Sequence, residues 1–75
     1  EKSIAYFKKV IELNPDYIEA YNGLGAALVK NGRIQEGMMQ FKKVLDINPY
    51  NKYAQKNIVL TRQLMKKNND ILMAP

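Results

Sequence analysis

The chain has 75 residues, enough for one small domain, and carries a formal net charge of +5. It contains no Cys and no His, which excludes disulfides, thiolate or imidazole metal sites and the commonest general base near neutral pH. No apolar run approaches the roughly 18 residues of a membrane span, and no signal peptide is visible. The missing cysteines fit a reducing compartment such as the cytoplasm, although the sequence names no location.

The first predicted element is a helix over about residues 2–13. One apolar stripe at helical spacing runs along it, formed by Ile4, Phe7, Val10 and Ile11. Asn14-Pro15 ends this helix, because the residue before a proline is pushed out of the α region. A second helix is predicted over about residues 17–30, with Asp16 in the position of an N-terminal cap.

Asn31-Gly32 forms the next predicted turn, in which Gly32 suits the left-handed position that follows a helix. The third helix runs over about residues 34–47. Asn48-Pro49 ends it in the same way as the first helix ends.

Asn51 is placed to cap a fourth helix that reaches about Lys67. We expect Asn68-Asn69-Asp70 to end that helix and residues 71–75 to follow as a short apolar tail. Sustained alternation of apolar and polar residues is absent from the sequence, so no strand is predicted.

The sequence repeats itself after 34 residues. Residues 7–10 (Phe-Lys-Lys-Val) and 14–15 (Asn-Pro) recur as residues 41–44 and 48–49, and the residues between them change conservatively. Self-similarity at a fixed period of this size is the signature of stacked repeats, each of which is one supersecondary unit.

Residues 18–51 resemble one complete tetratricopeptide repeat, a unit of two antiparallel helices. The positions that carry the resemblance are Tyr21, Leu24, Gly25, Leu28, Gly37, Phe41, Val44 and Pro49, with Gly32 in the turn between the helices. Leu28, Gly37 and Val44 depart from the Tyr, Ala and small residue usual at those places. Residues 1–17 resemble the second helix of a preceding repeat. The resemblance implies an all-α fold, in which antiparallel helix-turn-helix repeats form a short right-handed solenoid.

Gly25 and Gly37 lie in the interiors of predicted helices. Each costs about 1 kcal/mol of helix stability relative to Ala. We therefore expect a neighbouring helix to approach closely at both positions.

The fourth helix departs from the repeat pattern, because Tyr21, Gly25 and Leu28 correspond to Gln55, Val59 and Arg62. Residues 52–69 are therefore predicted to be a C-terminal capping helix, with residues 70–75 as the tail. The side expected to face inward is formed by Tyr53, Ala54, Ile58, Leu60, Leu64 and Met65. The other side is basic and carries Lys52, Lys56, Arg62, Lys66 and Lys67, with Val59 as an exception.

Catalysis by this segment is not expected. Ser3 and Thr61 are the only hydroxyl residues besides the tyrosines, and no His is present to activate them. The acidic residues are dispersed, so no pair suggests a general acid and base. No cofactor or metal ion is predicted either.

The resemblance implies that a peptide or partner helix binds on the concave surface formed by the first helix of each repeat. The residues expected on that surface are Glu19, Asn22, Ala26, Val29, Lys30, Tyr53, Lys56, Leu60 and Gln63. Their mixture of apolar and polar side chains suits a segment with apolar and acidic residues. Some family members clamp the C-terminal carboxylate of chaperones, but Ala26 stands where that clamp requires a second Asn.

A protein–protein interaction module is thus the predicted function. The alternative is a peripheral anchor to an anionic lipid or nucleic acid through the basic side of the fourth helix. Its modest charge density, with no aromatic stacking platform, favours protein over either of these partners. The stripe of Ile4, Phe7 and Ile11 is expected to be partly uncovered, which favours self-association through that face.

Overall fold

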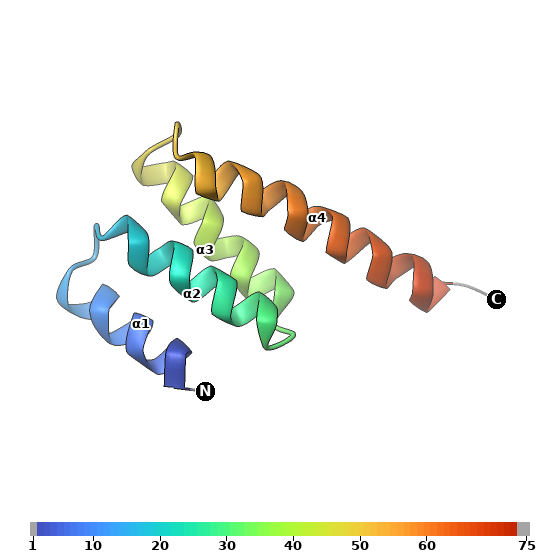
Figure 1. Cartoon of the computed structure of the whole chain (residues 1–75), viewed down its shortest axis with the longest axis horizontal. Helices are drawn as coiled ribbons and strands as arrows, with labels where there is room; N and C mark the ends of the chain where they lie inside the picture. Colours follow the sequence, from blue (N-terminus) through green and yellow to red (C-terminus); the bar gives the residue numbers. More distant parts are fainter. Residues whose placement is uncertain (1, 74–75) are drawn as a thin grey trace.

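The structure is a computed structural model that describes the backbone of residues 2–73 and the side chains of residues 2–68. It contains four helices: α1 (Lys2–Leu13), α2 (Ile18–Lys30), α3 (Ile34–Ile47) and α4 (Lys52–Met73). Successive helices run antiparallel to one another and stack into a short helical solenoid (Figure 1). Within residues 2–73 there is no strand, so the predicted all-α fold is confirmed.

The turn between α2 and α3 forms as predicted. Gly32 has a φ of 85°, in the left-handed region, where a side chain would be strained. The N–H of Arg33 donates to the carbonyl of Leu28 at 2.8 Å, and the N–H of Gly32 donates to that of Val29 at 3.0 Å. This pair of hydrogen bonds is a Schellman motif, and it satisfies carbonyls that the end of α2 would otherwise leave unpaired.

The caps of α2 and α4 differ. Asn51 caps α4 as predicted, since its Oδ1 accepts a hydrogen bond from the N–H of Ala54 at 2.9 Å. The prediction that Asp16 caps α2 is wrong, because α2 begins at Ile18 and Tyr17 occupies the N-cap position without a side-chain hydrogen bond. The 34-residue period aligns Asn51 with Tyr17, so Asp16 lies one residue too early to reach the helix N–H groups.

We therefore expect unequal effects from removing the two side chains. Asn51→Ala should lower the free energy of unfolding by about 0.5–2 kcal/mol, the usual contribution of an N-cap. Asp16→Ala should leave it within about 0.5 kcal/mol of the parent value, as for most surface changes. Urea denaturation followed by circular dichroism would measure both, and a larger loss for Asp16→Ala would contradict the assignment.

Helix α4 is longer than predicted. It continues through Asn68-Asn69-Asp70 and reaches Met73, so residues 71–73 are helical and do not form a separate tail. Residues 74 and 75 lie outside the described residues. Asn and Asp lower helix propensity by only a few tenths of a kcal/mol each, and neither Gly nor Pro interrupts residues 52–73. The final part of α4 extends past the other helices (Figure 1).

Helix α2 is the centre of the core, since it contacts α1, α3 and α4. On its α1 side, Leu24 and Leu28 pack with Ile4, which is only 5% exposed. The expected exposure of Ile4 is therefore wrong, because α2 covers it. Phe7 and Ile11 are half-buried against the same cluster.

On the other side of α2 lie two further clusters. One joins Tyr21, Val44 and Ala54, and the other joins Met38, Phe41 and Ile58. Together they bring side chains of α2, α3 and α4 into contact.

Close packing at the helical glycines is confirmed. A Cβ on Gly25 would lie 2.5 Å from Cε1 of Phe41, and one on Gly37 would lie 2.7 Å from the carbonyl oxygen of Gly25. Gly23 behaves in the same way, because a Cβ there would collide with the ring of Phe7. This close contact at Gly23 was not predicted, although Gly23 also lies inside a helix.

The inward side of α4 is narrower than predicted. Ala54, Ile58 and Thr61 are buried, whereas Tyr53 is 75% exposed and Leu60 51% exposed. Thr61 reaches the core because its Oγ1 donates to the carbonyl of Asn57 at 2.6 Å, which satisfies the hydroxyl inside the helix. The apolar residues that remain exposed on α4 are available for another contact.

Candidate functional site

The solenoid has an inner and an outer side. The backbones of α2 and α4 approach each other closely, whereas within the described residues those of α1 and α3 stay farther apart. Helices that are close on one side and spread on the other give the stack a curvature. The inner side of that curve is the surface of α2 and α4, as the repeat pattern predicts.

A hollow of about 270 Å³ lies on this inner side, and we call it the α2–α4 hollow. It is lined by Ala26, Val29, Lys30, Asn57, Leu60, Thr61 and Leu64. These positions follow helical spacing on both helices, so each helix presents one face to the hollow.

The lining is mostly apolar. Leu60 and Leu64 remain 51% and 37% exposed, although they stand beside the buried side chain of Thr61. Because the Thr61 hydroxyl is already bonded to Asn57 within α4, it adds little free polarity. Lys30 is the only charged residue in the lining, and it lies in the last turn of α2. The hollow thus combines exposed aliphatic carbon with one ammonium group.

The structure brings together four of the predicted binding residues, Ala26, Val29, Lys30 and Leu60. Tyr53, Lys56 and Gln63 are exposed but do not line the hollow. Glu19 lines a different hollow of about 130 Å³ between α1 and α2, beside Phe7. The residues predicted to form one concave surface therefore do not line a single hollow.

Asn22 lies between α2 and the start of α4. Its Nδ2 donates to Oδ1 of Asn51 at 3.4 Å, the same oxygen that accepts the capping bond from Ala54. The Oδ1 of Asn22 is buried and has no hydrogen-bond partner among the described residues. Asn22 thus links α2 to the N-terminus of α4. Its side chain is half-buried and is therefore less accessible to a partner than the side chain of an exposed residue.

The predicted binding set omits three residues of the lining, Asn57, Thr61 and Leu64. They lie three residues before, one after and four after Leu60 along the sequence, which places them on one face of α4. That spacing was the available signal. It was obscured because the inward face of the helix was assigned too broadly.

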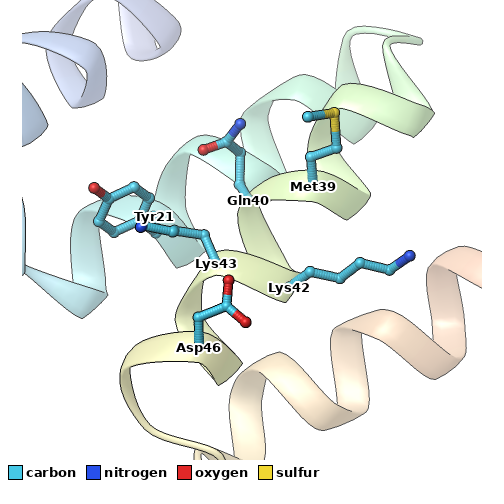
Figure 2. A pocket seen from close by; sticks show the side chains of 6 residues that line it. All are labelled: Tyr21, Met39, Gln40, Lys42, Lys43 and Asp46. Atoms are coloured by element: carbon cyan, nitrogen blue, oxygen red, sulfur yellow. The ribbon is translucent and has the colours of Figure 1, made fainter.

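A second hollow, of about 450 Å³, lies on the outer side beside α3 (Figure 2). Besides Tyr21 of α2, its lining comes from α3 and includes Met39, Gln40, Lys42, Lys43 and Asp46. Figure 2 shows Lys42 and Lys43 leaving α3 in opposite directions, and the Tyr21 hydroxyl donates to the carbonyl of Pro15 at 2.6 Å. This surface carries both signs of charge, beside the exposed side chain of Met39.

One ion pair stands at the start of α3, outside the α2–α4 hollow. Nε and Nη2 of Arg33 donate to the two carboxylate oxygens of Glu36, at 2.9 and 2.6 Å. These hydrogen bonds lower the pKa of Glu36 and raise that of Arg33. Both side chains are exposed, so the pair contributes little to stability.

The described residues hold no group of three or more Asp, Glu, His or Cys side chains placed to bind a metal ion. Among the helices within residues 2–73, none combines the length and apolar character that crossing a membrane requires.

Comparison with known families gives two matches. A family model described as a TPR repeat matches residues 1–32, and one described as a tetratricopeptide repeat matches residues 18–51. Together they cover α1, α2 and α3.

Curated proteins with similar segments include three of different kinds. The chain is 37% identical over 54 residues to the Arabidopsis thaliana tetratricopeptide repeat domain-containing protein PYG7, chloroplastic, covering 72% of this chain and 18% of that protein. It is 32% identical over 68 residues to the Caenorhabditis elegans BBSome complex member bbs-4, covering 91% of this chain and 14% of that protein. It is 26% identical over 65 residues to a Giardia intestinalis UDP-N-acetylglucosamine--peptide N-acetylglucosaminyltransferase, covering 87% and 4%.

The chain thus spans less than a fifth of the length of these relatives. No solved structure matches it significantly.

Proposed function

Because the chain belongs to the tetratricopeptide repeat family, whose repeats generally mediate protein–protein interactions, we propose that it binds a segment of a partner protein along α2 and α4. Repeats of this family are typically non-catalytic scaffolds. The chain is accordingly proposed to act by holding its partner, with no chemistry of its own.

The observation that carries this proposal is the α2–α4 hollow. Leu60 and Leu64 keep part of their apolar surface exposed to water, although Ile58 and Thr61 on the same stretch of α4 are buried. Burying a fully exposed Leu is worth about 1.5–3 kcal/mol, and covering either of these partly exposed side chains would gain the corresponding fraction. A segment lying along α2 and α4 would gain that free energy without rearranging the core.

We also propose that α4 acts as the capping helix. The positions that correspond to Tyr21, Gly25 and Leu28 of α2 are Gln55, Val59 and Arg62, and all three are exposed on α4. A further helix packed against them would have to bury a guanidinium group and lose the close approach that Gly25 permits. A terminal position suits such a face.

The binding surface can be located with a random dodecapeptide library displayed on phage and selected on the full chain. Titrating the selected peptides into isotopically labelled protein should shift the backbone amide resonances of Ala26, Val29 and Leu60. Shifts confined to Lys42, Lys43 and Asp46 would instead place binding on the outer side and contradict the proposal.

One observation favours the alternative of an anionic lipid or nucleic acid. The five cationic side chains of α4, listed above as its basic side, are exposed, and none of them joins an ion pair among the described residues. Salt separates the two functions. Binding to phosphate groups should weaken steeply as ionic strength rises, whereas binding to an apolar groove should change little.

We also propose self-association through α1, although fewer of its apolar side chains are uncovered than the sequence predicted. Since Ile4 is covered by α2, the stripe reduces to the half-buried Phe7 and Ile11, with Tyr6 65% exposed beside them. If these residues pair two copies, sedimentation should give a mass that rises with concentration, and Phe7→Glu should abolish the rise. A constant monomer mass would remove the case.

A further inference from the structure

We propose that the partner segment is acidic and amphipathic, and that it places one bulky apolar side chain in the α2–α4 hollow and a carboxylate against Lys30. This inference rests on the proposed function and specifies the chemistry of the partner.

The lining fits one bulky anchor. The hollow has a volume of about 270 Å³, larger than a single Leu or Phe side chain, and it opens to solvent. Ala26 contributes only a methyl group on the α2 side, which leaves the space that Leu60 and Leu64 border on the α4 side. A Leu, Met or Phe of the partner would therefore be surrounded by aliphatic carbon from both helices.

Charge favours an acidic partner. Lys30 lines the hollow, is exposed and joins neither of the ion pairs formed by the described residues. Helical spacing places Lys56 one turn before Leu60 and Lys67 about one turn after Leu64, on the same side of α4.

The nearest acid on α2 is Glu19, which lies 11 residues before Lys30. At 1.5 Å per residue this separation is about 16 Å along the helix, so Glu19 cannot neutralise the Lys30 end of the hollow. A basic partner would consequently be repelled by the positive charge beside its anchor. An acidic partner would be attracted by Lys30 on α2 and by Lys56 and Lys67 on α4.

Two matched pairs of variants test the inference. Leu60→Ala removes part of the lining, and Val59→Ala removes a side chain of similar exposure, 53% against 51%, that does not line the hollow. Lys30→Glu reverses the charge in the hollow, and Lys42→Glu makes the same change on the outer side. All four positions are on the surface, and folding of each variant is checked by circular dichroism.

The probe is the tightest dodecapeptide selected by phage display on the full chain, labelled for fluorescence anisotropy. We expect the selected pool to be enriched in peptides that combine a bulky apolar residue with Asp or Glu. Leu60→Ala and Lys30→Glu should each weaken binding about tenfold, the effect of roughly 1.4 kcal/mol. Val59→Ala and Lys42→Glu should change it less than about twofold, and a Glu→Lys peptide should regain affinity for the Lys30→Glu variant.

The outcomes separate this inference from the function it rests on. Peptides that lose affinity with Leu60→Ala but are neutral or basic, or are insensitive to Lys30→Glu, would overturn the acidic partner and leave groove binding intact. Peptides insensitive to both Leu60→Ala and Lys30→Glu would overturn the use of this hollow altogether.

Discussion

Replacing Phe41 by Ala should remove most of the free energy of unfolding of the chain, whereas the same replacement at Phe7 should remove much less. Phe41 is 2% exposed and packs with Met38 and Ile58, so its removal leaves a cavity between α3 and α4. Such a change costs about 3–5 kcal/mol. The stability of a domain of this size is itself near the lower end of about 5–15 kcal/mol, so little would remain.

Phe7 occupies the equivalent position 34 residues earlier but is less buried. Its ring lies over Gly23 and meets the ring of Tyr6 edge-on, with centroids 5.3 Å apart, and it is only half-buried. Phe7→Ala should therefore cost appreciably less than Phe41→Ala.

The two variants control each other, since both rings are followed by Lys-Lys-Val and differences in helix propensity cancel. Thermal and urea denaturation would compare them. Equal losses would show that Phe7 is as enclosed as Phe41.

Gly25→Leu is the second change from which we expect a large effect. The Cβ of any side chain at residue 25 would begin 2.5 Å from the ring of Phe41, and the carbonyl oxygen of Gly25 already faces Gly37 at close range. Neither neighbour can move freely, because Phe41 fills the core and Gly37 is held in α3. Leucine would gain about 1 kcal/mol of helix propensity, but the helices would have to separate.

We therefore expect Gly25→Leu to lower the free energy of unfolding by about 3 kcal/mol or more, at the upper end of overpacking changes. Ala26→Leu is the matched control, because residue 26 is the next position along α2 and its side chain is exposed. That control should stay within about 0.5 kcal/mol of the parent protein. An unchanged melting temperature for Gly25→Leu would show that α2 and α3 do not pack as described.

Much of this fold could be predicted because residues that end helices lie at the boundaries of the repeat. The Asn-Pro pairs predicted the ends of α1 and α3, and Gly32 predicted the end of α2, since a proline or a left-handed residue acts locally and needs no tertiary contact. The end of α4 lacked such a residue. Asn68 and its neighbours only weaken a helix, and a weak local preference did not decide where it ends.

The candidate site was less predictable, because it depends on how far each helix turns about its axis. Thr61 was not among the residues predicted to face inward on α4, yet it is only 4% exposed and its hydroxyl bonds within its own helix. That rotation of α4 carries Leu60 and Leu64 to the rim of the hollow and leaves Tyr53 in solvent. A sequence pattern gives the face that is apolar, but the neighbouring helices select which part of that face is covered.

The central place of α2 has a consequence for how the chain opens. Helix α1 packs on α2, and α4 rests on α2 and α3, so loss of α2 would free α1 and leave only the contacts between α3 and α4. Its amide protons should therefore exchange with solvent deuterium only when the whole chain unfolds, whereas α1 can detach by itself and exchange sooner. Deuterium uptake should thus begin in α1 and reach α2 last, which would show that the other helices depend on α2 for their stability.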